Sequence, residues 1–184
     1  MNKNRNNTGR TIRALLLGLV GFIAFAVGAE EQPLANLKNY QVNTPQMMSS
    51  GLPDAAHFET FKSLGVTRVV DLIPGDRGAE QTLVSDLGMD YHNIQVEWEN
   101  PTVANFVDYV AFMESSPRPG VTLTHCKLNW RGAVFTYLYR VNRLQEDEAV
   151  AREDMLAIWQ PNETWQQFIE KVKQHYQKLK LLQY

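Results

Sequence analysis

The sequence has a single cysteine in 184 residues, which excludes a disulfide-stabilised scaffold and a cysteine-rich zinc site. Its 11 glycines and 8 prolines are too few for a collagen-like or low-complexity chain. Basic residues show no excess either: 18 Lys and Arg face 20 Asp and Glu, a net charge of −2 that offers no basic surface to nucleic acid. Hydrophobic residues, by contrast, make up 44% of the chain and are spread along it. They suffice for the core of one packed domain.

Long apolar runs are also scarce, and the one that stands out lies near the N-terminus. Residues 14–29 form an uncharged apolar run that ends in small residues, and residues 1–13 carry four basic residues and no acid. This layout is typical of a secretory signal peptide, with Val27-Gly28-Ala29 resembling a cleavage site. We therefore predict that residues 1–29 are a signal peptide and that the protein is exported, to the periplasm. An uncleaved anchor facing the periplasm is the alternative.

Removal of residues 1–29 would change the charge of the protein. The four basic residues lost leave 14 basic against 20 acidic residues, a net charge of −6. This charge disfavours a polyanionic macromolecule, so no nucleic-acid partner is expected. Membrane contact is expected only through the N-terminal segment, if that segment is not cleaved.

The remaining chain alternates between helical and extended patterns. Residues 30–44 are predicted to lead into a domain formed by residues 45–184, with a short edge strand near residues 40–42. Strands are predicted over 68–73, 91–96 and 121–124, and helices over 54–64, 80–87, 102–114, 132–144, 146–158 and 164–182. Such alternation predicts an α/β fold, a small, mainly parallel central sheet flanked by helices on both faces.

The segment with the clearest chemical content is VTLTHCKLNWRGA, residues 121–133, in which a predicted strand runs into Cys126 and a helix follows Arg131. A loop between a strand end and a helix start points backbone N–H groups inward, and the helix dipole favours an anion there. Those amides would stabilise the Cys126 thiolate as a nucleophile, and Arg131 offers paired donors to an oxyanion. The alternative is a small buried cysteine at a strand end beside a surface arginine.

This segment contains one histidine, His125. His125 directly precedes Cys126, and we predict that it lies behind the loop, where hydrogen bonds of its ring shape the backbone. The other histidines, at 57, 92 and 175, are scattered along the chain. No metal site is therefore predicted.

The motif His-Cys, a short loop and Arg resembles the signature of the Cys-dependent protein tyrosine and dual-specificity phosphatases. The chain looks most like their small bacterial branch, in which four residues separate Cys from Arg, as they do between Cys126 and Arg131. The resemblance extends over roughly residues 45–175 through four further segments: Ser50-Gly51-Leu52-Pro53, Leu64-Gly65-Val66, Tyr91-His92-Asn93-Ile94-Gln95-Val96 and Trp159-Gln160-Pro161-Asn162.

This resemblance implies a function and a set of roles. Cys126 would attack phosphorus to form a phosphocysteine, and Arg131 would hold the equatorial oxygens. The phosphate-binding loop would comprise Lys127, Leu128, Asn129, Trp130 and Gly132. The expected substrate is a phosphorylated protein or a small phosphomonoester, of the phosphotyrosine or dual-specificity type, and no metal or cofactor is required.

The family also uses a general acid, usually an Asp on the loop after the strand that precedes the active-site helix. The corresponding loop here, residues 96–101, contains no Asp. Glu97 is the predicted acid because it follows an apolar strand and precedes the aromatic Trp98; Glu99 is the reserve. Both carboxylates are equally compatible with an ordinary solvated loop.

Two departures from the family pattern keep other functions open. Trp130 stands where relatives often have Gly, and Gly132 stands where they often have a hydroxyl that assists departure of the thiolate. If Asn129 accepts the unusual backbone angles and Trp130 points away from the pocket, the enzyme is active. Otherwise the chain is a catalytically weak oxyanion-binding relative. A six-residue Cys-to-Arg loop also resembles the rhodanese sulfurtransferases, whose Cys carries a persulfide.

Overall fold

The computed structural model describes residues 34–115 and 120–182. All of them belong to the unit Glu31–Tyr184, one of two into which the chain divides. The predicted signal peptide and most of the proline-containing turn before Gly120 lie outside the described residues. Among the described residues, no helix has both the length and the apolar character needed to span a bilayer.

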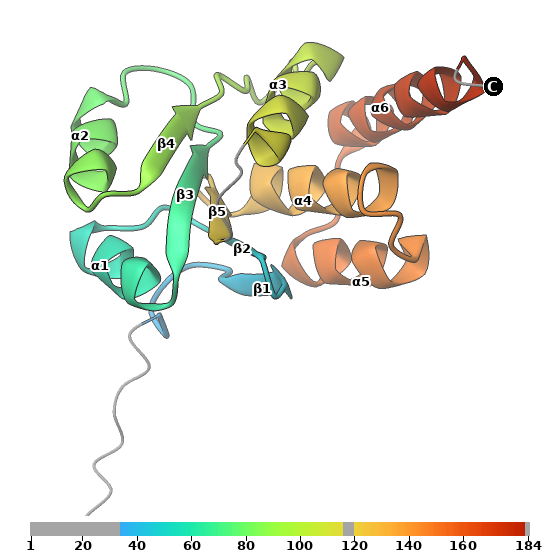
Figure 1. The fold of residues 1–184 in the computed structure, drawn as a ribbon. Coiled ribbons are helices and arrows are strands. Elements are labelled where there is room, and N and C mark those ends of the chain that lie inside the picture. The colour runs from blue at the N-terminus through green and yellow to red at the C-terminus, as the bar shows by residue number, and fades with distance from the viewer. Residues whose placement is uncertain (1–33, 116–119, 183–184) are drawn as a thin grey trace, which may run out of the picture. The chain divides into compact units, whose positions relative to one another are not determined.

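The centre of this unit is a five-stranded sheet (Figure 1). Its strands are β1 (Gln41–Thr44), β2 (Met47–Ser50), β3 (Val66–Asp71), β4 (Asp90–Asn93) and β5 (Val121–His125), in the spatial order β1-β2-β5-β3-β4. Only the β1–β2 pair is antiparallel. Parallel strands place their carboxyl ends at one edge of a sheet, so the ends of β2, β3 and β5 meet there.

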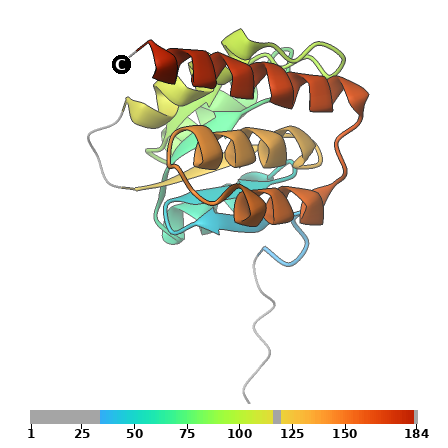
Figure 2. The same ribbon diagram turned by 90° about the vertical axis from the view of Figure 1, so that its right-hand side faces the viewer.

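Helices cover both faces of the sheet, which confirms the predicted α/β fold (Figure 1). On one side lie α1 (Ala55–Ser63) and α2 (Gly78–Asp86). On the other lie α3 (Val103–Glu114), α4 (Trp130–Asn142), α5 (Glu148–Ile158) and α6 (Glu163–Leu181). Figure 2 shows α4 between α5 and α6, and most of its residues are buried.

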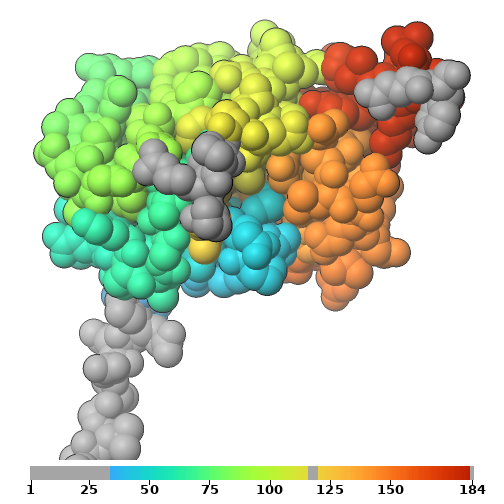
Figure 3. All heavy atoms as spheres, in the orientation of Figure 1, coloured from blue at the N-terminus to red at the C-terminus, as the bar shows by residue number. Residues whose placement is uncertain are grey.

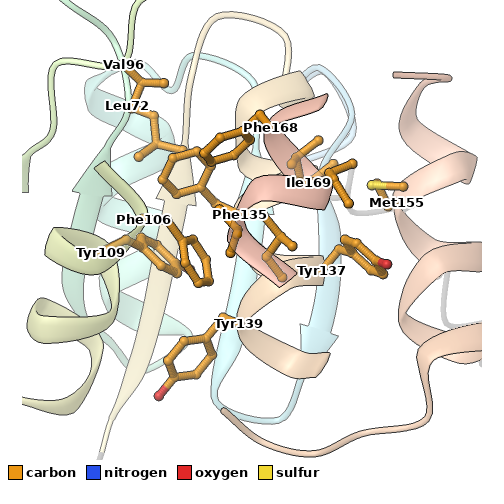
Figure 4. Close-up of a cluster of buried hydrophobic side chains, with 14 of the residues drawn as sticks. Leu72, Val96, Phe106, Tyr109, Phe135, Tyr137, Tyr139, Met155, Phe168 and Ile169 are labelled. Atoms are coloured by element: carbon orange, nitrogen blue, oxygen red, sulfur yellow. The ribbon is translucent and has the colours of Figure 1, made fainter. Parts of the chain in front are cut away.

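Each helical layer forms a hydrophobic core against the sheet. Phe58 and Phe61 of α1 pack with Val69 of β3 on the first face. The second core is richer in aromatic rings from three helices, some packed edge-on and some stacked (Figure 4): Phe106, Tyr109, Phe135 and Phe168. Two cores, one on each face, hold the sheet and leave its carboxyl edge for the loops.

Local signals set several helix boundaries. Thr102 caps α3 through its side chain, as predicted, and Asn105 completes a reciprocal capping box. Asp54 caps α1 in the same way with His57. The turn after α1 ends at Gly65, whose φ of 87° is unfavourable for a residue with a Cβ.

Two strands differ from the sequence prediction. The predicted strand over 91–96 is shorter, because the Asn93 side chain donates to the Asp71 and Ile73 carbonyls and ends the ladder with β3. β2 was not predicted, since Met47-Met48-Ser49-Ser50 shows neither alternation nor β-branched residues. It becomes a strand because β1 and β5 hydrogen-bond to its two edges.

The edge strand expected near residue 40 is present as β1 and contacts the far helical layer. The Gln41 side chain donates to the Asp154 carbonyl of α5 over 3.0 Å. Figure 3 shows the first strands, in blue, bordering the orange surface of α4 and α5. The edge strand of the sheet is thereby held against α5.

Candidate active site

The loop from Cys126 to Arg131 leaves the carboxyl end of β5 and enters α4. Its start is fixed from both neighbouring strands: Cys126 N–H donates to the Ser50 carbonyl over 3.3 Å, and Leu72 N–H donates to the His125 carbonyl over 3.0 Å. Because β5 is flanked by β2 and β3, the backbone on either side of Cys126 is held within the sheet.

Carbonyl groups of the loop are bound by donors from surrounding segments. Lys127 O accepts from Leu52 N–H at 3.3 Å, and Leu128 O accepts from Asn39 Nδ2 at 2.8 Å. Further along, Trp130 O accepts from Trp159 Nε1 at 2.9 Å. A trans peptide places its N–H opposite its C=O, so outward-bound carbonyls turn the following amides toward the cavity that the loop lines. The result is a cradle of N–H donors suited to an oxyanion.

Asn129 supplies the unusual backbone conformation of this cradle, as the sequence indicated. Its φ of 61° lies in the left-handed region, which Asn adopts more readily than most residues. Its Nδ2 donates to Asn39 O at 2.7 Å and to Ser49 Oγ at 2.9 Å. The buried side chain thus lies behind the loop, outside the cavity lining, and Gly132 packs directly against it.

A cavity of about 220 Å³ opens over the loop. It is lined by Trp98, Cys126, Lys127, Leu128, Trp130 and Arg131, so the predicted nucleophile and the predicted oxyanion-binding arginine share one small space. Cys126 is only 1% exposed. Arg131 Nε donates to Val96 O over 2.9 Å, which aligns its guanidinium at the cavity and leaves other N–H groups for a ligand.

Tryptophan forms the walls of this cavity. The sequence left the direction of Trp130 open; its ring lines the cavity and stacks on Trp159 with centroids 5.2 Å apart. Trp98 meets both rings, and the Arg131 guanidinium lies 5.3 Å from its ring centroid. Trp165 Nε1 donates to Trp98 O, so all four tryptophans of the chain belong to one cluster beside the loop. Trp130 therefore narrows the site without closing it.

The two predicted acids lie close in sequence to this cavity but do not line it. Glu97 and Glu99 are both exposed, on either side of Trp98, which alone enters the cavity from that loop. The backbone at Val96 is nevertheless bonded to Arg131, so the loop that carries Glu97 is attached to the site.

His125 faces away from the cavity, toward charged residues behind the loop. Its Nε2 lies 3.0 Å from Glu80 Oε1, and its Nδ1 lies 3.9 Å from Asp71 Oδ1. Asp71 is fully buried at the end of β3. Arg77 binds both carboxylates, and Tyr91 Oη donates to both. The sequence predicted that hydrogen bonds of the His125 ring shape the loop backbone; the ring instead faces Glu80 of α2, and neither of its nitrogens hydrogen-bonds to the loop.

This packing shifts the acid–base properties of the cluster. Burial would raise the pKa of Glu80, but His125 and Arg77 outweigh it and lower that pKa to about 2. Burial and the neighbouring carboxylates raise the pKa of the Tyr91 hydroxyl, which remains a donor. One ligand atom each from Asp71, Glu80 and His125 lies within 4.8 Å of the other two. Arg77, however, binds both carboxylates and already neutralises part of their charge. These residues therefore do not fit a metal site well.

Comparison with known proteins adds to this geometry. No protein-family model and no curated protein sequence matches the chain. Among solved structures, a DUF442 protein from Shewanella putrefaciens CN-32, described as a candidate phosphatase, is 31% identical; the match covers 78% of this chain and 97% of that one, with a TM-score of 0.68. The chain belongs to the Cys-dependent protein tyrosine and dual-specificity phosphatase superfamily.

Two other relatives share the fold of this phosphatase. TpbA of P. aeruginosa is 21% identical, with 73% of this chain and 84% of that one covered and a TM-score of 0.60. It has also been solved as a Cys-to-Ser variant with phosphotyrosine. The catalytic core of the PP-IP phosphatase SIW14 from S. cerevisiae is 16% identical, with 78% and 93% covered and a TM-score of 0.60.

Several residues of this phosphatase's site were not predicted from the sequence. Asn39 and Ser49 support the loop from segments far from it in the chain, and Glu80 reaches His125 from α2. Trp159 was identified only within a family-like segment, and its ring supports the cavity wall. Asn39, Ser49 and Glu80 carry no local signal, because their roles depend on which strands and helices become neighbours.

Proposed function

We propose that this phosphatase hydrolyses phosphomonoesters through a phosphocysteine on Cys126. The observation that carries the proposal is the single loop that places Cys126 and Arg131 at one 220 Å³ cavity. A nucleophile and an oxyanion cradle on one rigid segment can stabilise a phosphoryl group throughout its transfer.

The proposed reaction has two steps. Cys126 Sγ attacks phosphorus, the bond to the ester oxygen breaks, and the leaving oxygen receives a proton from a general acid. Water then attacks the phosphocysteine and loses its proton to the same group, which releases phosphate and the thiolate. Arg131 and the loop amides hold the nonbridging oxygens in both steps.

We assign the general acid to Glu97, with Glu99 as the reserve. Glu97 lies between Val96, whose carbonyl is bound by Arg131, and Trp98, which lines the cavity. A change in its side-chain rotamer or in the loop is needed to bring the exposed carboxyl over the cavity. Separate Glu97→Gln and Glu99→Gln variants test the choice: the basic limb of the pH–rate profile, where a general acid loses its proton, should disappear in the first variant only.

The cavity favours an aryl phosphomonoester, such as phosphotyrosine in a protein, over a polyphosphorylated alcohol. The lining residues Trp98, Trp130 and Leu128 offer aromatic and aliphatic contact, and the basic lining residues are Lys127 and Arg131. Phosphotyrosine, the ligand with which TpbA was solved, therefore fits this lining better than the PP-IP substrate for which SIW14 is named. Basic groups for several further phosphates are absent from this lining.

We further propose that the substrate is met outside the cytoplasm. The support is the basic and apolar layout of residues 1–29. Fusion of these residues to a periplasmic reporter tests export, and a shorter mature protein would distinguish cleavage from anchoring.

The test of the activity is hydrolysis of an aryl phosphate by the purified protein with a chelator and a reductant present. Cys126→Ser should abolish turnover and retain the rise in melting temperature produced by phosphate or vanadate. Turnover that persists in Cys126→Ser would refute the phosphocysteine route. An inactive wild type that still binds vanadate would instead indicate an oxyanion-binding relative.

A further inference from the structure

A second cavity lies between α5 and α6, and no step of the proposed reaction uses it. Its volume is about 370 Å³, larger than that of the cavity at Cys126. Its lining comes from α5, α6, the turn between them and Tyr137 of α4. Figure 2 shows α5 and α6 on either side of α4, joined at one end by the segment that follows α5. A cavity of this size lies within the range of about 300–1,000 Å³ that is typical of small-molecule sites.

This cavity is separate from the active site, although the two are close in the chain. The ring of Trp159 stacks on Trp130 at the active-site wall, and the next two residues, Gln160 and Pro161, line the second cavity. The two cavities share no lining residue. The turn itself is fixed, because Gln166 Nε2 donates to Pro161 O over 2.7 Å. A ligand between α5 and α6 would therefore meet a formed wall and leave the active-site cavity open.

Part of the lining is apolar and comes from both helices. Met155 of α5 and Ile169 of α6 are buried, as is Pro161 in the turn. Leu156 adds an aliphatic group that is 36% exposed. Aliphatic side chains of this kind favour a small apolar group of the ligand, which loses contact with water when it binds.

Two opposite charges line the same cavity. Arg152 of α5 and Glu170 of α6 are both exposed, and neither forms an ion pair with another described residue. The nearby Lys173 and Glu148, by contrast, bind each other at 2.6 Å. Burial raises the pKa of the Tyr137 hydroxyl most, and the charges of Arg152 and Glu170 lower and raise it, so both act on one group of the lining.

This pair of charges selects among ligands. A ligand with one charge would be attracted by one of the two side chains and repelled by the other. A zwitterion satisfies both, because its carboxylate accepts from the Arg152 guanidinium while its ammonium group donates to the Glu170 carboxylate. The balanced charge and the apolar part of the lining therefore favour the same kind of molecule.

We propose that this cavity binds a small zwitterion with an apolar side chain, the chemical class of the free apolar α-amino acids. Arg152 holds the carboxylate, Glu170 holds the ammonium group, and the side chain lies on Met155 and Ile169. This inference goes beyond the proposed function and does not depend on it, since its test measures binding and needs no turnover.

The experiment is a titration of the full chain with L-leucine, followed by NMR of methionine and isoleucine methyl groups. The methyl signals of Met155 and Ile169 should shift and saturate, whereas that of Met89, in the core on the other face of the sheet, should not move. Leucinamide lacks the carboxylate and N-acetylleucine lacks the ammonium group, so each should bind about tenfold more weakly. Equal affinities for the three compounds would overturn the proposal, as would the absence of saturable shifts with leucine.

Two variants assign the charges to their partners. Arg152→Gln should weaken leucine binding about tenfold and should not weaken the binding of leucinamide, which has no carboxylate to lose. Glu170→Gln should likewise weaken leucine but not N-acetylleucine. Each variant changes an exposed side chain, so the fold should be retained. A variant that weakened leucine and its matching analogue equally would contradict the assigned contacts.

Matched controls keep a general effect of charge apart from these contacts. Lys171→Gln removes a positive charge on α6, and Glu153→Gln removes a negative charge on α5. Both residues are exposed and neither lines the cavity. Leucine affinity should stay at the wild-type value in both controls. A loss as large as that in Arg152→Gln or Glu170→Gln would overturn the proposed site.

Discussion

The carboxamide of Asn129 occupies the space that a side chain at position 132 would need. A Cβ placed on Gly132 would lie 2.3 Å from Asn129 Oδ1, well inside any normal contact. Asn129 cannot easily withdraw, because its Nδ2 is bound to Asn39 and Ser49. The missing hydroxyl after Arg131 is therefore the steric consequence of placing Asn at the left-handed position of the loop.

Gly132→Ser should lower the stability of the protein and should not raise its turnover rate. Displacing Asn129 strains the loop, and overpacking of this kind costs about 1–3 kcal/mol in the free energy of unfolding. Urea denaturation together with aryl phosphate turnover measures both effects. The double variant Asn129→Gly with Gly132→Ser should lose less stability than the two single changes added together. Additive losses would contradict the steric account.

Asn39→Gly should weaken oxyanion binding with little effect on the rest of the fold. Glycine tolerates the φ of 50° at this position, so the change removes mainly the hydrogen bond to Leu128 O. The expected loss is about 1 kcal/mol, seen as a roughly fivefold weaker vanadate affinity. Asn36→Gly, at an exposed position of the same segment, serves as the control. Unchanged affinity would mean that the loop holds its shape without Asn39.

Arg131→Lys should lower kcat/KM for an aryl phosphate by at least about 100-fold. Lysine lacks the planar fork that binds two oxygens, and it cannot reproduce both the Val96 contact and the cavity contacts of the guanidinium. Steady-state kinetics measure the loss, and Arg143→Lys, at the exposed C-cap of α4, is the matched control. Near-normal kcat/KM in Arg131→Lys would remove Arg131 from the proposed mechanism.

Trp98→Leu should raise KM for an aryl phosphate by about three- to tenfold. The change removes an aromatic wall and the Trp98 contact with Arg131, interactions worth roughly 0.5–1.5 kcal/mol. Vanadate, which has no aryl group, should lose less affinity. An equal loss for both ligands would indicate that Trp98 acts through Arg131 and does not select the leaving group.

Acid should destabilise the wild type partly through Glu80. In the folded protein the pKa of this carboxyl is lowered from 4.5 to about 2, so the stabilisation is present above about pH 4.5 and is lost as the pH falls toward 2. The linked free energy is on the order of 3 kcal/mol. Urea midpoints across this range should fall less in Glu80→Gln than in the wild type or in Glu59→Gln, a control at an exposed position of α1. Parallel curves for all three would contradict the lowered pKa.

Much of the fold was predictable from local sequence patterns. The helix that Thr102 caps and the one that ends before Gly65 were predicted close to their observed positions, because amphipathic spacing, capping residues and glycine act within a few neighbours. β2 was missed because its sequence carries no strand pattern, and pairing with β1 and β5 alone makes it a strand.

The candidate site likewise has a part that the sequence predicted and a part that it did not. Cys126, Arg131 and the loop between them were identifiable because one short segment carries both the nucleophile and the oxyanion-binding arginine. The sequence also indicated that Asn129 could adopt the left-handed backbone, since that preference belongs to the residue itself. The orientation of Trp130 stayed open at the level of sequence, because stacking on Trp159 decides it.

The sequence by itself thus determined the fold class and the segment from Cys126 to Arg131 between a strand and a helix, whose causes are short-range. Only the tertiary structure decided what surrounds that loop: Asn39 behind Leu128, the tryptophan walls, and Glu80 against His125. These contacts join segments that are distant in the chain. They exist because parallel strands bring their carboxyl ends to one edge of the sheet, where residues without any common pattern become neighbours.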